Sequence, residues 1–200
     1  MKYKDMKEAV KLLKNEWNLG KKESGATNDI CAWIYLMEIL EETEQFVYYR
    51  EKNKLLGFAG YSKVNSRKHR LRKQFYTFIK NRLYKSKSIK DLKALHEYEN
   101  NYDYMPENLK NKFDGQLSII IIDPKLRGKG IGKRLLSDIF ELAKKDNIKN
   151  LYIYTDDSCS YYIYETLGCN RIYETIVKNK EYGKLPSVIE EHAYIYEKEL

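Results

Sequence analysis

The chain has 200 residues, of which 42% are hydrophobic, and this is enough for one substantial core, so we expect a single domain over residues 1–200. Its longest apolar runs are far shorter than the ~18 residues that span a bilayer, and its charged amino terminus lacks the apolar core of a signal peptide. Three cysteines leave one unpaired in any disulfide scheme and show no C-x-x-C spacing. These features argue against a membrane-spanning or disulfide-framed protein and predict a cytoplasmic protein without a metal site.

The net charge of +8 is concentrated in one segment. Between Lys63 and Lys90 there are eleven Lys or Arg and no acid, so the rest of the chain is acidic overall. Apolar residues recur there at helical spacing: Leu71, Phe75, Phe78, Ile79 and Leu83. This pattern predicts an amphipathic helix with one buried and one cationic face. We interpret the cationic face as a solvated surface. The alternative is an anionic partner, for which the nucleotide end of a cofactor, an acidic protein and RNA are open, although we do not expect a nucleic acid as a partner of the protein.

The first half of the chain predicts two helices followed by a β-hairpin. Met6, Val10, Leu13 and Trp17 share one face of a helix that ends near residue 19. A second helix is predicted from about Asn28 to near residue 42. Strands at 45–50 and 54–61 flank a short polar turn, which is typical of a hairpin.

The second half predicts a helical insertion and then alternating strands and helices. Residues 63–106 would form the insertion, with the basic helix followed by a second helix at 88–102. The elements after it are a strand at 117–122, a helix at 130–145, a strand at 150–154, a helix at 158–167, and strands near 170–177 and 188–198. A strand, a helix and a strand within 40 residues predict a parallel pair, and hence an α/β fold.

The stretch between the predicted strand at 117–122 and the following helix predicts an anion site. Pro124 ends the strand because it donates no hydrogen bond, and glycines then lead directly into the helix. Free amide groups at a helix start, supported by the helix dipole, bind phosphate, and glycines let the backbone approach it closely. Three cations add to the positive field of this loop: Arg127, Lys129 and Lys133.

Spacing separates three kinds of phosphate loop. A P-loop needs a glycine at 127 and a Ser or Thr at 134, but arginines occupy both positions. The dinucleotide fingerprint would need a third glycine where Lys133 stands. What remains is R-x-x-G-x-G, formed by Arg127, Gly130 and Gly132. This loop resembles the acetyl-CoA loop of the GNAT superfamily of acyl-CoA-dependent N-acetyltransferases.

The residues that follow extend the resemblance. The family carries a Y-E-x-x-G-F ending on a second helix, and here Tyr164-Glu165-Thr166-Leu167-Gly168-Cys169 lacks only the final aromatic. Asp157 stands where the family commonly has an Asn. The resemblance implies a central mixed, mostly antiparallel sheet in which the parallel strands near 117–122 and 150–154 splay apart. It places the acetyl-CoA motif region at about 115–170.

The resemblance also implies roles for individual residues. Ile120 and Ile122 would pair with the pantetheine arm of acetyl-CoA, and Asp157 would lie in the cofactor-binding segment. The pyrophosphate would be held by the loop and its flanking cations: Arg127, Gly128, Lys129, Gly130, Ile131, Gly132 and Lys133. Tyr164 would protonate the leaving CoA thiolate, which reference pKa values of ~8.5 for a thiol and ~10 for Tyr make uphill by roughly 2 kcal/mol. A strand amide freed by a bulge would bind the carbonyl oxygen.

The general base is left open by the sequence. Gln116 stands where many relatives carry a Glu, and Gln is not a useful base. Asp114, a tyrosine, a water chain or an amine that arrives deprotonated are the alternatives. His192 is interpreted as structural. Cys159 lies near a predicted helix start, where a thiolate is favoured, but direct transfer needs no covalent intermediate.

We therefore predict an acetyl-CoA-dependent N-acetyltransferase that moves an acetyl group to a primary amine by direct attack in a ternary complex. The acceptor would be a small-molecule or peptide amine, and a polycationic acceptor is disfavoured if the basic helix faces the acceptor mouth. The alternative is a catalytically weak acyl-CoA-binding or RNA-associated module on the same fold.

Overall fold

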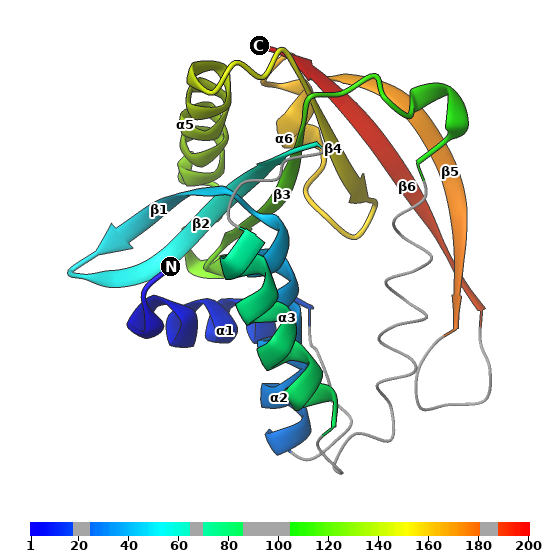
Figure 1. Cartoon of the computed structure of the whole chain (residues 1–200). Helices are drawn as coiled ribbons and strands as arrows, with labels where there is room; N and C mark the ends of the chain where they lie inside the picture. The colour runs from blue at the N-terminus through cyan, green and yellow to red at the C-terminus, as the bar shows by residue number, and fades with distance from the viewer. Residues whose placement is uncertain (18–24, 65–69, 86–104, 181–187) are drawn as a thin grey trace.

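A six-stranded mixed sheet organises the chain, in the order β1-β2-β3-β4-β6-β5 (Figure 1). The computed structural model describes residues 1–17, 25–64, 70–85, 105–180 and 188–200. The strands are β1 Gln45–Glu51, β2 Lys54–Lys63, β3 Gly115–Ile122, β4 Asn150–Asp156, β5 Asn170–Lys180 and β6 Val188–Glu199. Only β3 and β4 pair in parallel, so the predicted mixed and mostly antiparallel α/β fold is confirmed.

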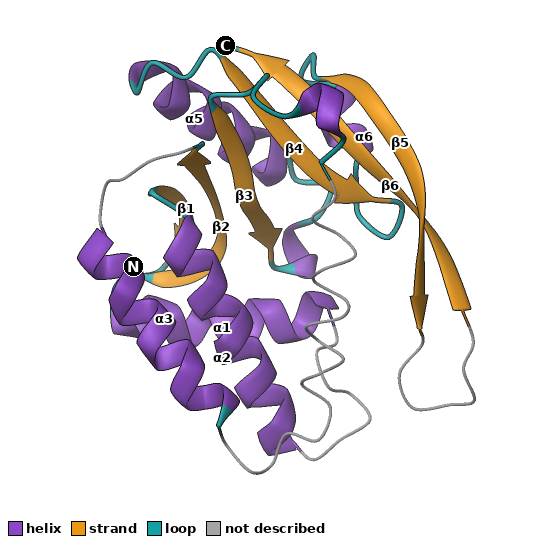
Figure 2. Ribbon diagram, turned by 45° about the vertical axis from the view of Figure 1, so that its right-hand side comes forward, coloured by secondary structure: helices purple, strands orange, loops and turns teal. Residues whose placement is uncertain are grey.

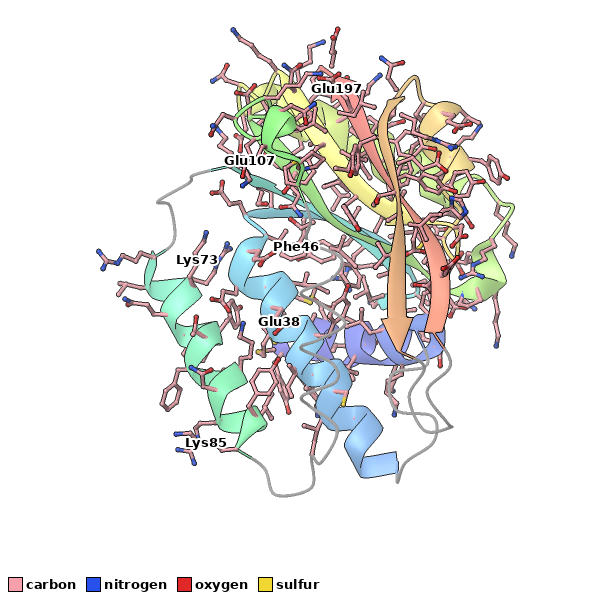
Figure 3. All side chains as sticks on the ribbon, turned by 90° about the vertical axis from the view of Figure 1, so that its right-hand side faces the viewer. Glu38, Phe46, Lys73, Lys85, Glu107 and Glu197 are labelled. Atoms are coloured by element: carbon pink, nitrogen blue, oxygen red, sulfur yellow. The ribbon has the colours of Figure 1, made fainter. Side chains whose placement is uncertain are left out.

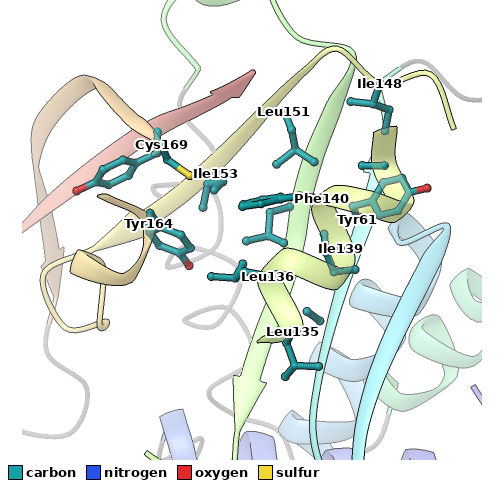
Figure 4. Packing of buried hydrophobic residues seen from close by; sticks show 14 of the residues in the cluster. Tyr61, Leu135, Leu136, Ile139, Phe140, Ile148, Leu151, Ile153, Tyr164 and Cys169 are labelled. Carbon is teal, nitrogen blue, oxygen red and sulfur yellow. The ribbon is translucent and has the colours of Figure 1, made fainter. Parts of the chain in front are cut away.

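Helices cover the two faces of this sheet (Figure 2). The helices are α1 Tyr3–Trp17, α2 Gly25–Glu42, α3 Arg70–Tyr84, α5 Ile131–Lys145 and α6 Tyr162–Glu165, with short 3-10 turns η1 Glu107–Leu109 and η2 Pro124–Leu126. One core lies between α1, α2 and the sheet, and includes Leu13, Met37 and Phe58. The other lies under α5 and α6, and includes Leu136 and Ile153 (Figure 4).

The side chains of β3 show how one strand serves both cores. Leu117 packs in the α5 core, whereas Ile119 packs in the α1 and α2 core. Residues two apart on a regular strand share a face, so an irregularity must lie between these two. The register against β2 shifts there, because Gly60 pairs with Ile119 and the next residue of β2 pairs with Leu117. Ser118 is therefore the extra residue of a β-bulge, which bends and twists its strand.

The parallel pair opens at the same bulge. β3 and β4 pair at three positions, ending with Leu117 opposite Ile153. Beyond that point β3 runs on to Ile122 and β4 runs on to Asp156 without pairing to each other. The predicted splay of these two strands is thus confirmed, and it leaves one edge of β3 without a strand neighbour.

The basic helix α3 has a different orientation from the one predicted. Leu71 is 82% exposed, and Phe75 and Phe78 are also exposed, whereas Tyr76 is buried. The expectation that Leu71, Phe75 and Phe78 belong to the buried face is wrong. On its inner side α3 packs Tyr76, Ile79 and Leu83 into the core with α1 and α2, and there Lys80 lies 3.5 Å from Glu38 and 3.0 Å from Glu41 of α2. Figure 3 shows Glu38 between the two helices and Lys85 at the far end of α3.

Most other predicted elements are found, with shifted ends. The second helix begins three residues before Asn28, and β3 begins two residues before Leu117. The predicted helix at 158–167 is reduced to the four residues of α6, preceded by turns. The predicted helix at 88–102 lies outside the described residues. Within the described residues, no helix is both long enough and apolar enough to cross a bilayer.

Candidate functional site

A cavity of about 510 Å³ opens where β3, the turn after it and the start of α5 meet α6. This volume is within the usual range for small-molecule sites. Nine residues of the predicted site line it: Ile120, Ile122, Arg127, Gly128, Gly130, Ile131, Gly132, Lys133 and Tyr164. The cavity is also lined by Glu16, Ile121, Leu126, Cys159, Ser160 and Ile163. Lys129 and Asp157, which were also predicted, are not among the lining residues.

One wall of the cavity is the unpaired part of β3. Ile120 and Ile122 lie beyond the last β3–β4 pair, and both pack against the α5 core. The backbone groups of β3 that face the opening have no partner on β4, so an extended ligand can pair with them as an added strand. The opening between the strands therefore suits a slender, amide-containing chain.

The loop after η2 forms the opposite end of the cavity. Gly128 and Gly130 have φ values of +76° and +77°, and no atom lies within 4 Å of where a Cβ would stand on either. The first helical bond of α5 runs from the Arg134 amide to the Gly130 carbonyl, at 3.1 Å. The amides of the preceding turn have no intrahelical acceptor, and they meet the field of the helix dipole. This arrangement favours a phosphate group.

Gly132 holds the loop close to its neighbours. A Cβ at this position would lie 2.8 Å from Ile163 Cδ1 and 3.1 Å from Ile122 Cδ1. The glycine therefore lets the start of α5 pack between the end of β3 and the segment of α6.

Tyr164 is buried on the α6 side of the cavity, beside Ile153 and Cys169 (Figure 4). Its amide donates to the Tyr161 carbonyl at 3.0 Å, and its carbonyl accepts from the Leu167 and Cys169 amides. Burial, together with the nearby Cys159, raises the pKa of the Tyr164 phenol above its ordinary value. The hydroxyl is consequently protonated throughout the neutral range and can donate a hydrogen bond to a group in the cavity.

Cys159 lines the same cavity but is not activated. Burial raises the pKa of its thiol to about 11, and the negative charge of Asp156 adds to this effect. The expected helix start does not compensate, because α6 begins only at Tyr162 and is four residues long. The expectation of a favoured thiolate at Cys159 is therefore wrong.

The candidate bases of the sequence lie away from the cavity. Asp114 Oδ2 accepts hydrogen bonds from the Lys149 and Asn150 amides, at the end of β3 opposite the loop and about 20 Å from Ile120. His192 Nδ1 lies 2.9 Å from Glu174 Oε1 in the middle of the β5–β6 pair. Gln116 lies in the paired part of β3, opposite Tyr152 of β4. None of these three lines the cavity.

Glu16 also lines the cavity, and no pattern in the sequence pointed to it. It lies in the last turn of α1, and both oxygens of its carboxylate contact Arg127 Nη2. The two residues are 111 positions apart, so no spacing rule connects them. Ser160 and Ile163 are closer in sequence to Tyr164 and could have been found as neighbours of that residue. In the described part of the chain, no group of three His, Cys, Asp or Glu is placed to hold a metal ion.

Residues 94–169 match the sequence model of the acetyltransferase (GNAT) family. No curated protein matches the chain. The fold is similar to those of an N-acetyltransferase from Staphylococcus aureus Mu50 (TM-score 0.55, 14% identity, 100% of this chain and 94% of that one) and a ribosomal-protein-alanine N-acetyltransferase from Brucella melitensis (TM-score 0.55, 11% identity, 100% and 97%). It is also similar to that of the ribosomal-protein-S18-alanine N-acetyltransferase from Escherichia coli (TM-score 0.53, 14% identity, 98% and 88%). At these identities the likeness establishes the fold.

Proposed function

We propose that the protein is an acetyltransferase that transfers an acetyl group from acetyl-CoA to a primary amine by direct attack, and the match of residues 94–169 to the acetyltransferase (GNAT) family model supports this proposal. The observation that carries the proposal is the cavity between the unpaired edge of β3, the glycine loop and Tyr164. It combines a site for an extended chain, a site for a phosphate and a proton donor in one continuous space.

The residues present fit acetyl-CoA. Ile120 and Ile122 offer their backbone to the pantetheine arm, and the amides at 128–132 meet the pyrophosphate with Arg127 and Lys133 beside them. Lys129 and Asp157 are proposed only as outer members of this site, since neither lines the cavity. The thioester of acetyl-CoA would supply an activated acyl group, and the residues of the cavity would hold that group in position for attack.

Tyr164 is proposed as the acid of the reaction. The amine nitrogen attacks the carbonyl carbon and releases one proton to water, the carbon–sulfur bond breaks, and sulfur keeps the electron pair and takes a proton from the phenol, which water then reprotonates. Because the pKa of Tyr164 is raised, a full transfer is more uphill than the reference values imply, and the tyrosine regains a proton readily. The phenol therefore acts chiefly as a hydrogen-bond donor while charge develops on sulfur, and the proton moves late.

The bulge at Ser118 is the proposed source of the oxyanion donor. A backbone amide that is released from the ladder at a bulge can point at the carbonyl oxygen on which negative charge develops. Its position at the opening of the β3–β4 pair is where an acyl group at the end of the pantetheine arm would lie.

An acceptor screen tests the proposal. Acetyl-CoA-dependent thiol release is followed across small amines, polyamines and peptide amino termini, with Tyr164→Phe beside the wild type. We expect release with at least one amine and a kcat about 10²-fold lower in Tyr164→Phe, at an unchanged Kd for acetyl-CoA. Tyr196→Phe is the matched control, because Tyr196 is a buried tyrosine whose hydroxyl donates to Glu165 at 2.7 Å.

Gln116 and the distance of the other candidate bases from the cavity favour one alternative, a catalytically weak acyl-CoA-binding module. Tight binding of acetyl-CoA without thiol release for any amine would establish that alternative. Equal kcat values for Tyr164→Phe and the wild type would show that Tyr164 is not the acid, but would not contradict the proposal that the protein is an acetyltransferase.

A further inference from the structure

The contact between Glu16 and Arg127 joins α1 to the phosphate end of the cavity. Glu16 comes from the last turn of α1, and Arg127 follows η2 directly before the glycine loop. The Arg127 side chain is 54% exposed and that of Glu16 is 27% exposed, so a ligand can reach the pair. Both residues line the cavity.

The chemistry of Glu16 is opposite to that of its surroundings. Arg127, Lys133 and the amides at the start of α5 form a cationic end that favours an anion. Among the described residues that line the cavity, Glu16 carries the one carboxylate. It is thus an anion held by an anion site, in the place where the charge of a pyrophosphate would lie.

The backbone of Glu16 is placed near Arg127 by α1, which is anchored in the core. The same helix buries Val10 and Leu13 in the core with α2 and the sheet. Its end is further joined to α2 by an ion pair between Lys14 and Asp29. When a pyrophosphate reaches Arg127, this carboxylate either leaves the guanidinium or stays as a repelling charge beside it, and both outcomes weaken binding.

We propose that Glu16 is a competing internal anion that lowers the affinity of the site for the pyrophosphate of CoA. This inference rests on the proposed function, since it assigns the cationic end of the cavity to that pyrophosphate. The carboxylate is not assigned as the general base, because it is engaged by the guanidinium at the phosphate end. Its role is to set how tightly the diphosphate ligand is held and how easily CoA leaves.

Calorimetric titration of CoA into Glu16→Gln and the wild type tests the proposal. Removing the charge is expected to lower the Kd for CoA by about 5-fold at low salt, the ratio that corresponds to an exposed ion pair of about 1 kcal/mol. The difference is expected to shrink in 0.5 M salt because exposed charges are screened there. Pantetheine, which has no pyrophosphate, is expected to bind both proteins equally.

Two further variants sharpen the test. In an Arg127→Gln background, adding Glu16→Gln is expected to change the Kd by less than in the wild type, because the two charges act on each other. Asp29→Asn is the matched control: it removes the ion pair with Lys14 of α1 without touching the cavity, and the Kd for CoA should stay unchanged.

The outcomes separate this inference from the proposed function. A wild type that binds CoA with the same Kd as Glu16→Gln, or more tightly than it, overturns the inference and leaves the proposed function standing. A wild type that binds neither CoA nor pantetheine overturns both. A gain in affinity for pantetheine equal to that for CoA would overturn the inference, because it would show that Glu16 acts on the whole cavity and not on the pyrophosphate.

Discussion

Strand β4 pairs with its two neighbours in opposite ways. With β6 it forms an antiparallel ladder along its whole length, from Asn150 to Asp156. With β3 it forms three parallel pairs and then separates. The same strand is therefore fully paired at one edge and borders the splayed opening at the other. Where the two strands separate, backbone N–H and C=O groups have no partner on the neighbouring strand, and a bound ligand can form hydrogen bonds with them.

The closed side is reinforced by side chains as well as by backbone. The Arg171 guanidinium lies over the Tyr161, Tyr194 and Tyr196 rings, at 4.3 to 5.5 Å from their centroids. It also donates to Glu165 at 2.8 Å. On the open side, the side chains that cross from α5 and α6 to β3 are apolar, and glycines replace bulk. This difference predicts that substitutions on the closed side lower stability, whereas substitutions on the open side chiefly weaken ligand binding.

The largest effect is expected at the rung where the pair opens. Ile153 is fully buried and stands opposite Leu117 at the last β3–β4 pair. Ile153→Ala should lower the free energy of unfolding by about 3 kcal/mol, since it removes methyl groups from a packed core. Urea unfolding measures this. Ile120→Ala, on the open part of β3, is the control and should cost roughly 1 kcal/mol while weakening CoA binding. Equal losses of stability in Ile153→Ala and Ile120→Ala would mean that the side chains at the opening are packed as tightly as those of the core.

Arg171→Met is expected to act on stability alone. It keeps an unbranched apolar stem and removes the guanidinium contacts with three rings and two carboxylates, so we expect a loss of about 1.5 kcal/mol. Thermal unfolding and CoA titration are measured on the same sample. A changed Kd for CoA would show that the closed side and the cavity are coupled, and this would contradict the prediction that substitutions on the closed side affect stability alone.

A pair of glycines with the same backbone strain sharpens the comparison. Gly130 and Gly168 have φ values of +77° and +70°, and in each case an alanine would have room for its Cβ. Either substitution should cost about 1 kcal/mol of stability, because L residues are strained at positive φ. Only Gly130→Ala should also weaken CoA binding, by about 10-fold, since its methyl group would stand where the phosphate approaches. Equal CoA affinities in the two variants would place the phosphate elsewhere.

The smallest effect concerns the pH dependence of stability at the β1 edge of the sheet, on the other side of the opening from β6. The pKa of Asp5 lies below its ordinary value, first because Arg50 of β1 donates a hydrogen bond to its carboxylate. A depressed folded pKa adds stability that is complete above the unfolded pKa of ~4 and is lost as pH falls through the folded value. Asp5→Asn should therefore be less stable than the wild type by about 1 kcal/mol at pH 7, with the gap closing below about pH 4.

Chemical denaturation across this pH range measures the gap. Asp138→Asn is the control, because Asp138 is exposed and lies 4.0 Å from Arg134 on α5. It should match the wild type at every pH. A gap for Asp5→Asn that does not change with pH would assign the effect to packing and not to the carboxylate.

Short-range patterns were enough to predict much of this molecule. The strand, glycine loop and helix from 117 to 145 follow from proline and glycine positions and from apolar periodicity, and in the helix Leu135, Ile139 and Ala143 are buried. Tyr164 was identified from the Y-E-x-x-G ending that it begins, which resembles the motif of the GNAT family. The predictions that were wrong depend on partners elsewhere. The buried side of α3 depends on its packing with α1 and α2, and the pKa of the Cys159 thiol depends on burial.

The sequence by itself determined most of the elements, the glycine loop and the resemblance to the GNAT family, because each is encoded within stretches of a few to a few tens of residues. Only the tertiary structure decided where the sheet opens, which side of α3 meets solvent and that Glu16 reaches Arg127. The reason is that secondary-structure propensities depend on residues close in sequence. The bulge in β3, the burial of the Cys159 thiol and the ion pair between residues 111 positions apart depend on packing between distant segments, and a local sequence pattern does not encode it.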